Sequence, residues 1–361
     1  MLESLATKQR EKLQHVSETF KGLVNEPEKK LRYVRSFFAR KLIHTNLQIL
    51  YNCNFRCQIC DFWKKPARMK PKLSLDQVDM ISDKLAQIGP QIVSIGGGEP
   101  LLHKDLDGIV RTLARHHFPV MICNGWFMTE EKAAQLFEAG IHEISVSVDY
   151  IDPAKHDAQR GVEGAWQHAI DALQSIERAR TKSWQRVHMI SVIMSDNIDH
   201  VEPLIQKCGD MGITYLVTLY SDARGRPEDR KAKNSRVSEE LLRLKDKYPE
   251  FVQLRGYLSR FSEAVDHGGV GPCYAGKNLC NIDSQGNVSL CIDHLEDSVG
   301  NILEEDMQEI ERKLVEKHLN NTCKTCWTSC RGAIETLMHG DSVLSNLIDY
   351  YGMTKPMPLG R

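Results

Sequence analysis

Three cysteines on one short loop constrain this chain more than any other feature. Cys53, Cys57 and Cys60 follow an apolar run at residues 47–50 in a C-x3-C-x2-C spacing. A cubane [4Fe–4S] cluster normally takes four cysteines, so a loop with three leaves one iron open to a ligand from outside the protein. Zinc also binds cysteines at such spacings, although its catalytic sites usually draw on histidine or carboxylate. The loop therefore predicts a cluster with one open iron, and zinc is the alternative.

Composition favours a cytoplasmic protein with a large core. The 361 residues are 41% hydrophobic, enough for a barrel-sized domain plus a small one. A formal net charge of −1 gives no basic field for nucleic acid. The first ten residues have no apolar signal region, and no stretch approaches the ~20 apolar residues that span a bilayer. Most of the eleven cysteines are bunched at 53–60, 273–291 and 323–330, which is typical of metal or cluster ligation in a reducing compartment.

From residue 47 onward the chain alternates strand and helix signals. This order predicts parallel strands joined by crossover helices. Six strands are expected, at residues 47–51, 92–95, 120–123, 143–149, 187–194 and 215–220. The fold class is therefore α/β, with a partial (β/α)6 TIM-like barrel over residues 45–250. In such barrels the C-terminal strand ends and the loops after them carry the site.

The candidate site residues follow these strand ends. The cysteine loop comes after the first strand. The others are Gly97, Gly98 and Glu99 after the second strand, Asn124 after the third, Ser147 and Asp149 at the end of the fourth, and Tyr220 at the end of the sixth. The topology thus implies one pocket. The polar segment 221–234, with Arg226, leaves the same end and is either a lid with substrate contacts or a solvated linker.

The N-terminal extension, residues 1–44, is predicted to be helical. A break is expected at 25–27, because Pro27 is tolerated near a helix start and not in a helix interior. The second of the two helices is apolar on one face and basic on the other. It either covers one end of the barrel or, through residues 29–44, rests on an anionic membrane surface.

The C-terminal part is organised around six cysteines. Residues 251–335 contain a hairpin at 281–292 that turns at Gln285 and Gly286, a helix at about 304–318 and a later C-x2-C pair. The hairpin and the pair predict a second metal site of up to four thiolates, either a cluster or a structural zinc. We therefore expect a small hairpin-plus-helix cluster domain, followed by a C-terminal tail at 336–361.

Two motifs taken together identify a family resemblance. Residues 45–335 resemble the radical S-adenosylmethionine (SAM) superfamily, in particular its members with a SPASM or Twitch extension. The C-x3-C-x2-C loop is the signature of that superfamily, and Gly97-Gly-Glu-Pro100 matches its SAM-binding motif. The resemblance implies that SAM binds the open iron of a [4Fe–4S] cluster through its amino and carboxylate groups, with Gly97, Gly98 and Glu99 at the amino group.

The same resemblance implies further cofactor contacts. Ser147 and Asp149 would meet the ribose, and Asn124 would line the cofactor pocket. The residue before the third cysteine is usually aromatic in the family and is Ile59 in this chain. This departure removes ring stacking at that position, while the backbone of Ile59 can still meet adenine.

The later cysteines resemble a shortened auxiliary-cluster domain. The spacing Cys273-x12-Gly286-x4-Cys291 is similar to the opening half of a SPASM domain, and Cys323-x2-Cys326 to its continuation. Only Cys330 follows, so the resemblance implies the Twitch arrangement, with one auxiliary [4Fe–4S] cluster on those four cysteines. Cys280 and Cys330 are left over. Each of them either replaces one of the four ligands, or donates a hydrogen atom to the substrate, or is an ordinary packed side chain. Two three-cysteine clusters remain an alternative.

The resemblance implies a radical oxidoreductase. A 5′-deoxyadenosyl radical made from SAM takes hydrogen from the substrate, and the auxiliary cluster accepts an electron in a net dehydrogenation. The single auxiliary cluster is most similar to the aminocyclitol dehydrogenase branch, which predicts a sugar-like or aminocyclitol-like small molecule as substrate. Flavodoxin or ferredoxin would supply the electron. Tyr220 and Arg226 are acid–base candidates from position alone, and Cys280 is a candidate hydrogen donor.

Three other functions stay open. The first is a ribosomal-peptide maturase, and the second is an epimerase or a C–C bond-forming enzyme acting on a lipid or sugar. The third is a non-catalytic zinc or cluster-binding module, against which the coincidence of the cysteine loop with Gly97-Gly-Glu99 argues.

Overall fold

The central sheet follows the predicted barrel and extends beyond it. The computed structural model describes residues 26–64, 72–223, 226–340 and 343–355, together with 357 and 359. One sheet has nine strands in the order β6-β5-β4-β3-β2-β1-β7-β8-β9. The first six run parallel: β1 (His44–Leu50), β2 (Ile92–Gly97), β3 (Phe118–Cys123), β4 (Glu143–Ser147), β5 (Arg186–Ile193) and β6 (Thr214–Leu219). The α/β fold class and the partial (β/α)6 barrel are confirmed.

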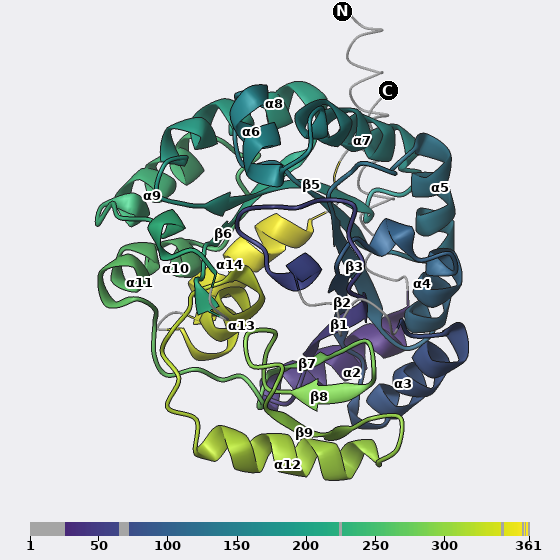
Figure 1. Cartoon of the computed structure of the whole chain (residues 1–361). Helices are drawn as coiled ribbons and strands as arrows, with labels where there is room; N and C mark the ends of the chain where they lie inside the picture. The colour runs from purple at the N-terminus through teal and green to yellow at the C-terminus, as the bar shows by residue number, and fades with distance from the viewer. Residues whose placement is uncertain are drawn as a thin grey trace, which may run out of the picture.

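Crossover helices form a ring outside these strands (Figure 1). They are α3 (Leu75–Ile88), α4 (Leu106–Ala114), α5 (Glu130–Ala139), α7 (Ala165–Ala179) and α8 (Val201–Met211). Their ends follow local chemistry: the Ser74 side chain accepts from the Gln77 N–H while the Gln77 side chain accepts from the Ser74 N–H, a capping box. An additional helix, α6 (Pro153–Arg160), precedes α7 and was not expected from the sequence.

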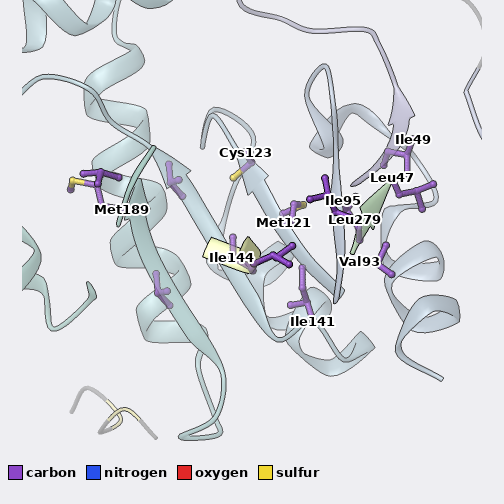
Figure 2. Close-up of a cluster of buried hydrophobic side chains, with 14 of the residues drawn as sticks. Leu47, Ile49, Val93, Ile95, Met121, Cys123, Ile141, Ile144, Met189 and Leu279 are labelled. Atoms are coloured by element: carbon purple, nitrogen blue, oxygen red, sulfur yellow. The ribbon is translucent and has the colours of Figure 1, made fainter. Parts of the chain in front are cut away.

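The core lies between the strands and the helix ring. Alternate residues of each strand, among them Leu47, Ile49, Val93 and Ile95, are buried with the apolar faces of the helices (Figure 2). The other residues of β1 include the polar Gln48, which pairs with Gly96 of β2. Because side chains alternate along a strand, packing of one face against the helices leaves polar and small residues on the inner face of the barrel.

The N-terminal helix α2 (Pro27–Phe38) covers the end of the barrel at which the strands begin. The Tyr33 ring lies edge-on to Phe118 at 5.5 Å, and the Lys29 ammonium donates to the carbonyls of Ala114, at the end of α4, and His117, at 2.8 and 3.1 Å. On the opposite face Leu31, Val34 and Phe38 are exposed. The helix predicted before α2 lies outside the described residues. No helix in the described part of the chain is long and apolar enough to cross a bilayer.

The predicted hairpin is present and joins the barrel sheet. Strand β7 (Leu279–Ile282) turns through Gly286 into β8 (Asn287–Ser289), and β9 (Ser298–Asn301) adds a third antiparallel strand. Gly286 has a φ of 86°, which suits glycine at this turn. On its other edge β7 pairs in parallel with β1. The cysteine-rich region therefore lies directly beside the first strand of the barrel.

Helices close the open side between β6 and the hairpin, as Figure 1 shows for α13 and α14 in yellow. They are α9 (Val237–Lys247), α10 (Arg255–Leu258), α11 (Phe261–His267), α13 (Ser329–His339) and α14 (Val343–Thr354). Helix α12 (Met307–Leu319) lies on the other side of the hairpin, against β9 and α3 (Figure 1). Arg186, at the start of β5, donates to the carbonyl of Met353 at 2.5 Å. The predicted tail at 336–361 thus contains a packed helix.

Candidate functional site

The cysteine loop lies at the C-terminal end of β1, as predicted. Cys53, Cys57 and Cys60 belong to one apolar cluster that also contains Phe55 and Ile59. The Phe55 N–H donates to the Cys53 sulfur at 3.4 Å, and burial raises the pKa of Cys53 to about 12. Three thiols gathered in a dry pocket are stable as thiolates only beside a strong positive charge, and coordinated metal supplies that charge. The loop therefore fits an iron–sulfur cluster.

Gly97, the last residue of β2, and Gly98 after it hold the cysteine loop against the sheet. The Gly98 N–H donates to the carbonyl of Leu50 at 2.8 Å, and the Glu99 N–H donates to the carbonyl of Asn52 at 2.9 Å. A Cβ at Gly97 would stand 1.9 Å from the Leu50 oxygen, and one at Gly98 would stand 2.0 Å from the Asn52 oxygen. The glycines are therefore required for close backbone approach, in addition to the cofactor contact that the resemblance implies.

Glu99 is a buried carboxylate with two backbone donors. Its side-chain oxygens accept from the N–H groups of Asn124 at 2.8 Å and Leu101 at 3.1 Å. Burial nevertheless raises the pKa of Glu99 to about 7. A carboxylate in this setting is stabilised by a cationic ligand, so Glu99 fits the ammonium group of SAM. The Asn124 side chain donates to Asn54 at 2.9 Å, which ties the end of β3 to the cysteine loop.

Both carboxylate oxygens of Asp149 accept hydrogen bonds from other residues of the chain. One carboxylate oxygen accepts from the Arg160 guanidinium at 2.6 Å and the other from the Val192 N–H at 2.8 Å. Arg160 also donates to the Cys57 sulfur. This arrangement favours a positioning role for Asp149, behind the arginine that contacts the cluster loop. Ser147 is half-buried at the same end of β4 and remains the ribose candidate.

The two acid–base candidates lie near the site in different ways. Tyr220 packs with Cys57 and Ile59, its hydroxyl donates to the carbonyl of Pro227 at 2.9 Å, and burial raises its pKa to about 12. A neutral, hydrogen-bonded phenol is a poor proton acceptor. Arg226 donates to the Asp293 carboxylate at 2.8 Å, and Asp293 lines a second cavity.

Five cysteines line that second cavity: Cys273, Cys291, Cys323, Cys326 and Cys330. The Cys323 sulfur lies 3.3 Å from the Thr325 hydroxyl, and the Cys326 sulfur lies 3.8 Å from the Arg331 guanidinium. The Cys330 sulfur, in the first turn of α13, lies 3.2 Å from the Thr328 hydroxyl. Hydrogen bonds to sulfur orient thiolate ligands and tune clusters. Cys273, Cys291, Cys323 and Cys326, the four that the resemblance implies, therefore stay the predicted ligands, and Cys330 is the fifth thiol of the cavity.

The side chains that line the second cavity are of the kind that bind an iron–sulfur cluster, because five of them are cysteines. Among the described residues, no three His, Cys, Asp or Glu side chains are already arranged around a single ion position. The five thiols instead surround a common space. The hydrogen bond with Cys323, together with burial, raises the pKa of Cys273, so binding of metal and loss of the proton go together there.

The sixth C-terminal cysteine is not brought to either site. Cys280 lies on β7 beside Thr45, which is near the start of β1, and its sulfur is 3.5 Å from the Thr45 hydroxyl. Cys53 follows the opposite end of β1. The structure therefore does not place Cys280 where it would donate hydrogen to a substrate at the cysteine loop.

The two sites are joined through β6. The Ser329 N–H, at the start of α13, donates to the Thr218 hydroxyl on β6 at 3.0 Å. Tyr220 follows β6 and packs against the cysteine loop, and Arg226 reaches Asp293 in the second cavity. The second cavity therefore reaches the C-terminal end of β6, and Leu279 on its other side pairs with His44 at the start of β1.

Comparison with known proteins agrees with this geometry. The model of the radical SAM superfamily matches residues 47–208. Residues 47–208 are a radical SAM domain. Domains of this family bind SAM and a [4Fe–4S] cluster, which confirms the predicted cofactors at family level, and homologues of the SPASM type carry auxiliary clusters. The cysteine-rich region after the radical SAM domain matches that pattern.

Relatives fall into two groups. GTP 3′,8-cyclase from Yersinia pestis is 31% identical over 163 residues, which are 44% of this chain and 48% of that protein. The chain thus matches about half the length of these relatives. The mycofactocin maturase MftC from Mycolicibacterium smegmatis is 26% identical over 307 residues, covering 79% of this chain and 76% of the maturase. The second alignment extends over both the barrel and the cysteine-rich region.

Solved structures share the fold at low sequence identity. SuiB from Streptococcus suis, bound to its precursor peptide SuiA, has a TM-score of 0.61 at 15% identity, over 80% of this chain and 70% of SuiB. The structure of anSMEcpe with bound AdoMet has a TM-score of 0.63 at 16% identity, over 86% of this chain and 92% of that one. These likenesses support the barrel with its C-terminal extension.

Sequence reasoning missed three charged residues at the sites. Arg160 lies at the end of α6. This helix has Asp152 as its N-cap and Pro153 as its first residue, a common pair at a helix N-terminus. Arg331 and Glu335 line or border the second cavity and are four residues apart on α13. Their i,i+4 spacing can be read from the sequence, but the contact of Arg331 with Cys326 depends on the tertiary fold.

Proposed function

We propose that this chain is a radical SAM enzyme that oxidises its substrate, with Cys53, Cys57 and Cys60 holding the SAM-binding cluster. When bound, SAM and its cluster supply a 5′-deoxyadenosyl radical that takes hydrogen from the substrate, and an auxiliary cluster on Cys273, Cys291, Cys323 and Cys326 accepts the remaining electron. The observation that carries the proposal is the position of the five-cysteine cavity, which lies beside the end of β6 that faces the cysteine loop.

The residues of the chain prepare this reaction by holding groups and excluding water. Glu99 pairs with the ammonium group of SAM, while Gly97 and Gly98 fix the distance between β2 and the cysteine loop. Apolar packing by Phe55 and Tyr220 keeps the loop dry. A dry, fixed pocket protects a reactive radical and keeps the target C–H close to it.

Oxidation at a carbon that bears a hydroxyl or amine also releases a proton. We propose Asp293 as the carboxylate that receives it, because its contact with Arg226 at 2.8 Å links the second cavity to the segment that follows β6. Its side chain is only 8% exposed. In this proposal Arg226 is a positioning residue, Asp293 is the proton acceptor, and Tyr220 has a packing role.

Two substrate classes are proposed, each on its own observation. A peptide is favoured by the alignment with mycofactocin maturases over both parts of the chain and by the fold shared with peptide-bound SuiB. A sugar-like or aminocyclitol-like small molecule is favoured by the cavity, whose thiols suffice for one auxiliary cluster. Mass spectrometry separates the outcomes: either substrate class loses two hydrogens on oxidation, whereas an unchanged mass would indicate epimerisation and contradict the proposed oxidation.

Further parts of the proposal concern partners and location. A flavodoxin or ferredoxin would supply the first electron, in the cytoplasm. Contact with an anionic membrane through residues 29–44 is supported by the exposed Leu31, Val34 and Phe38 beside the basic residues of α2. Co-sedimentation with anionic vesicles tests this contact, and substitution of the three apolar residues by serine should abolish it.

A further inference from the structure

A buried arginine contacts one of the cysteines of the second cavity. Arg331 lies on α13 with a side chain 3% exposed. Its guanidinium donates to the carbonyl of Cys326 at 2.8 Å and lies 3.8 Å from the Cys326 sulfur. It also donates to the carbonyl of Pro272, next to Cys273, at 3.0 Å. The positive charge of Arg331 is therefore fixed among groups that carry two of the four favoured ligands.

A carboxylate stands behind this arginine. Glu335, one turn further along α13, accepts from Arg331 at 2.8 Å and from the Tyr274 N–H at 2.7 Å. Its side chain is 5% exposed, so solvent and salt do little to screen either charge. The two groups form a buried pair in which the guanidinium meets the Cys326 sulfur and the carboxylate accepts from the backbone beside Cys273.

The same arrangement occurs at the first site. Arg160 contacts the Cys57 sulfur and is held from behind by Asp149 at 2.6 Å. Each cysteine group thus has one buried arginine on a sulfur and one carboxylate behind the arginine. Arg160 comes from α6, which follows β4 of the barrel, and Arg331 comes from α13 in the C-terminal region.

Such a pair changes how readily a cluster accepts an electron. Reduction adds a negative charge, which a nearby guanidinium and hydrogen bonds to sulfur stabilise, while a nearby carboxylate disfavours it. In a low-dielectric interior both effects are stronger than in water. Arg331 contacts a sulfur directly at 3.8 Å, whereas Glu335 bonds to the backbone beside Cys273, so we expect the effect of Arg331 to be the larger.

We propose that Arg331 raises the reduction potential of the auxiliary cluster and that Glu335 limits this increase, so that the cluster accepts an electron from the substrate radical. This inference rests on the proposed function, because it presupposes a cluster in the second cavity. Arg331 and Glu335 are positioning residues that act through the cluster.

The experiment is an anaerobic redox titration followed by electron paramagnetic resonance, without substrate. It uses the full chain with Cys53, Cys57 and Cys60 replaced by alanine, so that only the auxiliary cluster contributes. In this background Glu335→Gln removes a negative charge while its amide oxygen keeps both hydrogen bonds. Arg331→Gln removes the positive charge, and Arg331→Lys keeps the charge but loses the planar contact with Cys326.

The expected shifts have opposite signs. Glu335→Gln should raise the ratio of reduced to oxidised cluster at a fixed potential about tenfold, a shift of about 59 mV for one electron. Arg331→Gln should lower that ratio by at least as much, and Arg331→Lys should fall between Arg331→Gln and the parent. The matched controls are Arg312→Gln and Glu309→Gln, which change the same charges in an exposed pair on α12 and should leave the ratio unchanged.

Two results would overturn the inference. If the cluster is present but the Glu335 and Arg331 variants move its potential in the same direction, or not at all, the pair does not tune it and the proposed function stands. If the parent has no iron in the second cavity, the inference and the proposed function both fail. A variant that only damages the fold cannot produce the expected result, because it would not shift the reduction potential in opposite directions for Glu335→Gln and Arg331→Gln.

Discussion

Substitution of Gly98 by alanine tests how the SAM site is assembled. The new Cβ would stand 2.0 Å from the Asn52 oxygen, whereas real Cβ contacts are essentially never shorter than 3.0 Å. The end of β2 and the cysteine loop must therefore separate by about 1 Å. That separation weakens the backbone hydrogen bonds of 2.8 and 2.9 Å that Gly98 and Glu99 donate. Each such bond contributes about 1 kcal/mol, so the variant should lose about 2 kcal/mol of stability.

The effect on chemistry should be larger than the effect on stability. A displacement of about 1 Å at a reacting centre costs roughly 100-fold in rate, so formation of 5′-deoxyadenosine should fall by about that factor. Gly98→Ala should also hold less iron at the first site, because the cysteine loop itself moves. The assay combines iron and sulfide analysis, thermal unfolding and anaerobic turnover of SAM.

Gly352→Ala is the matched control. Nothing lies within 4 Å of a Cβ at Gly352, which is in helix α14. Alanine there should leave turnover unchanged and add about 0.5–1 kcal/mol of stability. If Gly98→Ala keeps its full iron content and stability and only binds SAM more weakly, the glycine acts through the cofactor alone, and the reasoning about loop docking is refuted.

Three further predictions concern single side chains. Burial raises the pKa of Glu99 to about 7 from 4.5, so the free energy of unfolding of the SAM-free protein should fall as the pH rises from 4.5 to 7. SAM affinity by calorimetry should rise as the pH increases through 7, because the ionised carboxylate attracts the ammonium group, and Glu99→Gln should weaken binding at pH 8 and abolish the pH dependence. Arg160→Met should cost about 3–5 kcal/mol in chemical denaturation, because it leaves the buried Asp149 carboxylate without its partner, while an unchanged midpoint would contradict the pairing. Cys330→Ala should keep the auxiliary cluster in iron analysis and Cys291→Ala should lose it, whereas the reverse result would make Cys330 a ligand.

Local patterns predicted most of the barrel. The alternation of strand and helix signals located all six parallel strands to within a few residues, because each repeat carries its own turn and cap chemistry, as Ser74 does for α3. The cysteine loop and Gly97-Gly-Glu99 were both identified, and topology alone brought them together. The structure adds the reason for the glycines, which is the contact with Leu50 and Asn52.

Contacts between distant segments were not predictable in the same way. The parallel pairing of β7 with β1 joins segments more than 230 residues apart, as does the contact of Cys280 with Thr45. Neither leaves a periodic signal in the sequence. The same holds for the arginines: their chemistry follows from which sulfur each one meets, and that is decided by helix packing.

The central claim is that one chain holds a SAM-binding cluster and a separate auxiliary cluster. The most direct measurement is iron and sulfide content after anaerobic reconstitution of the variant in which Cys53, Cys57 and Cys60 are replaced by alanine. A [4Fe–4S] cluster on the four later cysteines predicts about four irons per chain and no formation of 5′-deoxyadenosine from SAM. A variant without iron, or with zinc in its place, would contradict the account.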